Sequence, residues 1–141
     1  MIRLRSMVLV AALLVPATGL AQELMADNFI GKFRAWTVLG QRIALANKDG
    51  RTLYTFEKDE PGKSNCVDAC ATNWPPELAI ADDKAFEDFT IITRADGGKQ
   101  WALKGKPLYR SAKDQKPGDA LGEGADDAWF IAETEAHDMG M

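Results

Sequence analysis

Histidine, serine and cysteine are scarce in this chain of 141 residues. It has one histidine, His137, close to the C-terminal end, together with three serines and two cysteines. The nucleophile of a hydrolase needs a base that a third group holds in place. A histidine this close to a chain end is poorly placed for that role. The composition therefore argues against a serine or cysteine hydrolase and favours a binding protein over an enzyme.

Positive charge is also in deficit. Lysine and arginine number 17 against 21 aspartate and glutamate residues, which gives a formal net charge of −4. Nonspecific nucleic-acid binding requires a basic surface, so no nucleic-acid partner is expected. The glycine pair in Gly122–Gly124 lacks the third glycine of a phosphate-binding loop and has acidic neighbours, so it predicts no nucleotide site.

No apolar run is long enough to cross a bilayer, which takes about 20 residues. The longest, residues 7–15, follows a start with two arginines and precedes small residues that end at Ala21. This pattern is typical of a secretory signal peptide. We predict a signal peptide at residues 1–21, with cleavage after Ala17 as the alternative. The mature chain, with a net charge lowered from −4 to −6, is then expected to be soluble, without a transmembrane segment, and periplasmic or secreted.

The two cysteines, Cys66 and Cys70, are separated by three residues. In an exported protein such a pair is expected to form a disulfide. The alternative is a redox-active dithiol, but that motif normally spaces its cysteines as Cys-x-x-Cys. A structural disulfide is therefore the main interpretation, and a dithiol oxidoreductase is the alternative.

The chain contains an internal repeat at an offset of 55 residues. The first copy supplies six residues that recur in the second: Gly50, Leu53, Tyr54, Lys58, Asp59 and Trp74 match Gly105, Leu108, Tyr109, Lys113, Asp114 and Trp129. Five of the matches fall in one phrase, Gly-x-x-Leu-Tyr-x-x-x-Lys-Asp, and a Pro-Gly pair follows each copy. Two copies at this period indicate a duplicated supersecondary unit. We place repeat one at about residues 35–81 and repeat two at about 89–133.

The alternation of β-prone runs with turn signals predicts a mainly β fold. In each copy a β-prone run precedes a hairpin, and Asp49-Gly50 is a strong hairpin turn signal. Helical periodicity is weak, with short helical turns expected at residues 67–73 and 82–86. We predict one compact β domain at residues 22–136, built from two pseudo-symmetric β-hairpin repeats with six to eight short strands. Residues 137–141 are expected to form a flexible tail.

The repeated phrase also resembles a known family. Residues 54–59 fit the motif Tyr-x-(Phe/Trp/Tyr)-x-x-Asp, and the string from Cys66 to Pro76 follows with its Trp-Pro-Pro ending. This pattern resembles the secreted bacterial repeat family, often labelled as lipoproteins, that carries this motif. The resemblance spans roughly residues 43–133 and implies an exported two-repeat protein with no assigned activity. Two features depart from it: Ser111 replaces the motif's aromatic in the second copy, and no cysteine lies at the signal cleavage site.

Aromatic and acidic residues of the repeat form a candidate cleft, because pockets favour interfaces between structural halves. Core packing is the main interpretation for the aromatics, because their side chains bury large areas, and the cleft is the alternative. The two repeated aspartates are expected to cap turns by accepting backbone N–H groups; an acid or Ca²⁺ site is the other interpretation. The candidate cleft residues are Tyr54, Phe56, Asp59, Trp74, Tyr109, Asp114 and Trp129.

The C-terminal tail holds the candidate metal ligands. His137, Met139 and Met141 offer imidazole and thioether groups, which suit Cu(I); the alternative is a flexible terminus of accidental composition. The leading hypothesis is therefore an exported periplasmic module, non-catalytic and without a cofactor, that binds an unknown envelope protein or small ligand. A copper-handling protein and a dithiol oxidoreductase are the two alternatives.

Overall fold

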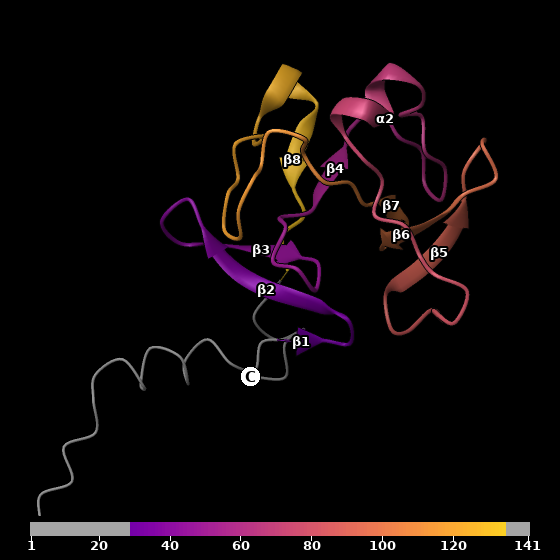
Figure 1. The fold of residues 1–141 in the computed structure, drawn as a ribbon, viewed down its shortest axis with the longest axis horizontal. Helices are drawn as coiled ribbons and strands as arrows, with labels where there is room; N and C mark the ends of the chain where they lie inside the picture. The colour runs from indigo at the N-terminus through magenta and orange to yellow at the C-terminus, as the bar shows by residue number, and fades with distance from the viewer. Residues whose placement is uncertain (1–28, 135–141) are drawn as a thin grey trace, which may run out of the picture.

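The computed structural model describes residues 29–134, and this part of the chain is mainly β (Figure 1). Eight short strands form three small sheets, in the orders β1-β2-β3, β4-β8 and β5-β6-β7. The elements in chain order are β1 (Phe29–Ile30), β2 (Phe33–Val38), β3 (Arg42–Ala46), β4 (Tyr54–Phe56), α2 (Ala69–Asn73), β5 (Phe89–Thr93), β6 (Lys99–Leu103), β7 (Lys106–Pro107), the 3₁₀ turn η1 (Ala125–Asp127) and β8 (Trp129–Ile131). The predicted fold class is confirmed. The signal-peptide and tail predictions concern residues outside this range.

One of the two predicted helical turns is present. Helix α2 lies within residues 67–73, whereas residues 82–86 are not helical and end at Phe86, which forms a β-bridge with Phe89. The side chain of Asp83 explains the difference, because its Oδ2 accepts the amide of Ile80 at 2.8 Å and pairs with Lys32 at 2.6 Å. An aspartate that bonds to nearby backbone in this way competes with helix formation.

Each repeat builds an antiparallel hairpin from its first two strands. β2 pairs with β3, so that Trp36 lies opposite Ala44, and β5 pairs with β6, so that Ile91 lies opposite Trp101. A tight turn then leads toward the repeated tyrosine: Tyr54 begins β4, and Tyr109 follows two residues after the end of β7. In the first copy the side chain of Asn47 accepts two backbone amides of this turn, both at 3.0 Å.

The last segment of each repeat pairs with the other repeat. The carbonyl of Ala132, in repeat two, accepts the amide of Leu45, in repeat one, at 2.7 Å. Its equivalent at the 55-residue offset, Glu77 of repeat one, accepts the amide of Trp101 in repeat two at 2.9 Å. β4 of repeat one likewise pairs with β8 of repeat two. Each copy thus completes the sheet of the other.

The two copies meet at their repeated tyrosines. Tyr54 and Tyr109 exchange both backbone hydrogen bonds, at 2.8 and 3.0 Å, as expected of a pair on a pseudo-twofold axis. In Figure 1, β4 lies between β8 and β7 near the middle of the molecule, where this exchange takes place. Both tyrosines are fully buried.

Two buried clusters form the core. One surrounds the repeated tyrosines and tryptophans and includes Cys66. The other packs beneath the hairpins, where the ring of Phe33 stacks on Phe89 at 4.6 Å and meets the edge of Trp101 at 5.3 Å. Among residues 29–134 no helix is long and apolar enough to cross a membrane.

Candidate functional site

The repeated tyrosine and aspartate of the two copies pair crosswise. The Tyr54 hydroxyl donates to Oδ2 of Asp114 at 2.6 Å, and the Tyr109 hydroxyl donates to Oδ2 of Asp59 at 2.7 Å. Each bond therefore joins one copy to the other. A hydrogen bond to an ionised carboxylate is among the stronger ones in proteins, so these two pairs fasten the repeats together.

The second oxygen of each aspartate holds the loop of its own repeat. Oδ1 of Asp59 accepts the amide of Asn65 at 2.6 Å, and Oδ1 of Asp114 accepts the amide of Leu121 at 2.9 Å. Both aspartates therefore accept backbone N–H groups, as expected of turn-capping residues.

Burial governs the protonation of this region. It raises the pKa of Tyr54 and of Tyr109 far above the ordinary value of 10.0, and the bonds to the carboxylates raise both further. Burial also raises the pKa of Asp59, whereas the donors Asn65 and Tyr109 lower it. At neutral pH the tyrosines are protonated donors, which is what a structural clamp requires.

The repeated tryptophans stack face to face. The rings of Trp74 and Trp129 lie 4.0 Å apart with an interplanar angle of 3°. Phe56 stacks on Trp129 at 4.2 Å, so Trp129 lies between two rings. In the second copy Ser111 takes the place of Phe56 and has no ring to stack on Trp74. This departure from the repeat breaks the pseudo-symmetry.

The structure brings the seven candidate cleft residues into one region, but most of them are buried. Tyr54 and Tyr109 are fully buried, and Trp74, Asp114 and Trp129 are each less than one-tenth exposed. Only Phe56 and Asp59 line an open cleft.

This cleft, with a volume of about 210 Å³, lies where the two repeats diverge beside the tyrosine exchange. One wall is the chain that follows Tyr54, and the other is the turn between β6 and β7. The full lining is Thr55, Phe56, Glu57, Asp59, Glu60, Pro61, Lys104, Gly105, Lys106 and Pro107. Pro107 lines this cleft and has no hydrogen-bond donor with which to close it.

The pseudo-equivalent position in the other half is filled. Arg51, the counterpart of Lys106, donates from Nη1 to the carbonyl of Asp114 at 2.8 Å. Thr52, the counterpart of Pro107, donates from Oγ1 to the carbonyl of Asp119 at 2.6 Å. The two copies have thus diverged, and the cleft is open on the Asp59 side.

The turns show the same difference in packing. A Cβ added at Gly50 would lie 2.8 Å from Pro117, whereas one at Gly105 would lie 3.9 Å from Pro61. The filled half is therefore also the more tightly closed one.

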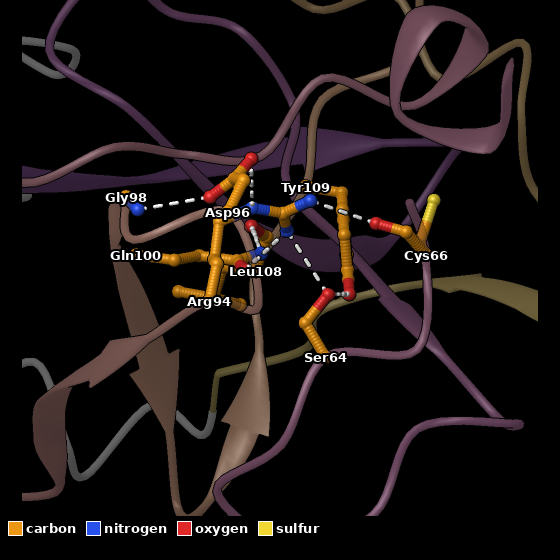
Figure 2. Close-up of polar contacts among 8 residues, drawn as sticks. All are labelled: Ser64, Cys66, Arg94, Asp96, Gly98, Gln100, Leu108 and Tyr109. Atoms are coloured by element: carbon orange, nitrogen blue, oxygen red, sulfur yellow. Dashed lines mark hydrogen bonds and ion pairs between the residues drawn. The ribbon is translucent and has the colours of Figure 1, made fainter. Parts of the chain in front are cut away.

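A buried arginine that no sequence motif indicated lies next to the site. Arg94 is 4% exposed and donates from Nη1 to Ser64 at 2.9 Å and to Gln100 at 2.8 Å, and from Nη2 to the carbonyl of Cys66 at 2.8 Å (Figure 2). Its Nε lies 3.5 Å from the exposed Asp96. Arginine is seldom fully buried. Its position directly after a β-prone run was therefore no signal of burial.

The arginine reaches the Tyr–Asp pair through a serine. Ser64 Oγ lies 2.6 Å from the Tyr109 hydroxyl, which itself donates to Asp59. Because the Tyr109 hydroxyl gives its proton to Asp59, Ser64 is the donor to Tyr109, and it is the acceptor from Arg94; Figure 2 shows both contacts of Ser64. The chain from Arg94 to Asp59 leads from the core to the cleft wall.

The predicted disulfide between Cys66 and Cys70 is present, and residues 29–134 contain no free cysteine. Cys66 is fully buried and its carbonyl is bound by Arg94. The disulfide thus belongs to the packed core beside the arginine.

The candidate copper ligands lie outside the described residues. His137, Met139 and Met141 belong to the C-terminal end, so copper binding stays a prediction. Within residues 29–134, histidine, cysteine, aspartate and glutamate form no cluster of three that could hold a metal ion.

Together these features define a β protein of two interlocked repeats, fastened by crossed tyrosine–aspartate pairs. The chain belongs to a family described as a secreted repeat of unknown function, whose sequence model matches residues 43–77 and 90–133. The resemblance seen in the sequence is thereby confirmed, and the crossed pairs give a structural role to the tyrosine and aspartate of its motif. No curated protein and no solved structure matches the chain significantly.

Proposed function

We propose that this secreted protein is a non-catalytic periplasmic module that binds an envelope protein or a small ligand in the cleft beside Asp59. The observation that carries the proposal is the divergence of two equivalent positions. One is filled by Arg51, and the other is left open as a cleft of about 210 Å³ lined by both repeats. Sites for ligands favour concave surfaces between structural halves.

The chemically active groups near the cleft are already bonded to other groups of the protein, which favours binding over catalysis. The Tyr54 and Tyr109 hydroxyls are buried and donate to carboxylates, and their raised pKa values keep them protonated. Cys66 is buried in a disulfide. Phe56 and Asp59 therefore contribute shape and charge to the cleft rather than a nucleophile.

A charge change on the cleft wall tests the proposal. Glu57→Lys with Glu60→Lys alters the lining, and Ala112→Lys with Gln115→Lys places the same two lysines at the equivalent positions of the filled half; all four native residues are exposed. After chemical crosslinking in cells that export the protein, the first variant should lose adducts that the wild type and the second variant form. Retention of all adducts by the first variant would overturn the proposal.

A further inference from the structure

The filled half of the molecule shows which chemical group suits the open half. We propose that the cleft receives a guanidinium group, supplied by an arginine side chain of a partner protein. The inference rests on the proposed function, because it names the ligand chemistry of the same cleft.

In the filled half, the side chain of Arg51 occupies the position equivalent to the cleft. The guanidinium of Arg51 donates to the main-chain carbonyl of Asp114 at 2.8 Å. The equivalent residue, Asp59, lines the cleft. Lys106 occupies the sequence position that corresponds to Arg51, so this half has no arginine of its own at the cleft. The open half therefore has the counterpart of the acceptor residue but lacks the arginine that serves it.

The residues of the cleft wall also differ from their counterparts in the filled half. Glu57 and Glu60 line the cleft, whereas their counterparts in the filled half are Ala112 and Gln115. Phe56 adds an aromatic ring where the filled half has a serine. Carboxylates bind guanidinium groups through charge-assisted, often bidentate hydrogen bonds, and a ring face attracts a cation. Both changes make the open half a better receptor for a cation.

The opposite wall of the cleft carries Lys104 and Lys106. Together with the carboxylates of Glu57, Asp59 and Glu60, these two ammonium groups give the lining a formal charge of −1, so the cleft suits a single guanidinium rather than a polybasic segment. The Glu60–Lys63 ion pair, at 3.2 Å between exposed side chains, is of the weak kind that an incoming cation displaces.

Titration of the ¹⁵N-labelled protein tests the inference. Nα-acetyl-arginine amide should shift the amide signals of residues 56–60, with a dissociation constant on the order of 1–10 mM for so small a probe. The citrulline analogue, neutral but of the same shape, should bind about tenfold more weakly because it lacks the charge. Agmatine distinguishes an arginine side chain of a protein from a free guanidino compound. If agmatine binds as tightly as the arginine amide, the site is assigned to free guanidino compounds.

Three variants refine the test. Glu57→Gln with Glu60→Gln should weaken arginine binding, whereas Asp126→Asn with Asp127→Asn, which removes the same charge away from the cleft lining, should leave it unchanged. Lys106→Arg should abolish binding, because its own guanidinium then occupies the position that Arg51 fills in the other half.

The inference and the proposed function fail in different ways. Equal binding of arginine and citrulline amides, or a shift only with Nα-acetyl-glutamate amide, overturns the guanidinium assignment and leaves the cleft as a binding site. The absence of shifts with every probe also overturns the assignment. Persistence of all cell adducts in the Glu57→Lys, Glu60→Lys variant overturns the proposed function itself.

Discussion

Replacement of the buried Arg94 by methionine should destabilise the protein strongly. Methionine keeps much of the length and volume of the side chain but removes every donor. Gln100 Oε1 and the Cys66 carbonyl would lose the donors that now lie at 2.8 Å, and Ser64 would lose the one at 2.9 Å.

The size of the effect follows from these lost bonds. A buried acceptor left without its donor costs about 1–3 kcal/mol, and Ser64 retains Tyr109 as a partner. The folded state no longer has to bury a guanidinium, which offsets part of the cost. We therefore expect a loss of about 3 kcal/mol in the free energy of unfolding. For a domain of roughly 100 residues this lowers Tm by about 12–20 °C.

Urea unfolding monitored by tryptophan fluorescence and circular dichroism measures this loss. Arg110→Met is the matched control, because the Arg110 side chain is 41% exposed and its ion pair with Glu77, at 3.4 Å, should contribute about 1 kcal/mol or less. Arg94→Lys keeps the charge without the planar fork and should fall between the two. The reasoning is refuted if Arg94→Met destabilises the protein no more than Arg110→Met.

Four further predictions concern the site and its support. Tyr109→Phe removes a donor that lowers the pKa of Asp59, so this pKa should rise further in ¹³C-detected NMR titrations, whereas Tyr54→Phe should leave it unchanged. Because the pKa of Asp59 is already raised by folding, its effect on stability should be most favourable at low pH. That effect should diminish as pH rises from 3.8 through the folded-state pKa; an acid-side loss of stability assigned to Asp59 would contradict this sign. Gly122→Ala should cost about 1–3 kcal/mol in urea unfolding, because the new Cβ would lie 2.6 Å from Trp74; a neutral result would contradict the packing. Reduction of the disulfide should cost about 2 kcal/mol, since its loop is short, and a loss above about 5 kcal/mol would show that it does more than close that loop.

The local features of the fold were predictable because they depend on neighbouring residues. Asp49-Gly50 marked a hairpin turn, and the spacing of Cys66 and Cys70 in an exported chain indicated a disulfide; both are present. The offset of 55 residues located the two copies. It also placed the repeated tyrosines and aspartates in equivalent positions.

How the copies combine could not be predicted in the same way. Tyr54 is five residues from Asp59 and sixty from Asp114, and a repeat pattern is equally compatible with either partner. The exchange of the last strands settles the choice, and it depends on pairing between distant segments such as those around Leu45 and Ala132. The burial of Arg94 likewise becomes visible only once these segments are assembled.

The cleft was predictable only in outline. Phe56 and Asp59 were among its expected residues, but the lysines of the β6–β7 turn were not. The repeat is recognisable in the sequence from the residues that are identical between the copies. The cleft results from positions where they differ, Pro107 in place of Thr52 and Lys106 in place of Arg51.

The central claim is that the cleft beside Asp59 is a binding site and that the equivalent position beside Asp114 is not. The most direct test places the photo-crosslinking residue p-benzoylphenylalanine at position 57 and, in separate cells, at the equivalent position 112. Both native residues, Glu57 and Ala112, are exposed. After irradiation of exporting cells, the account predicts a discrete adduct from position 57 and none from position 112. Equal adducts from both positions, or an adduct from position 112 alone, would contradict it.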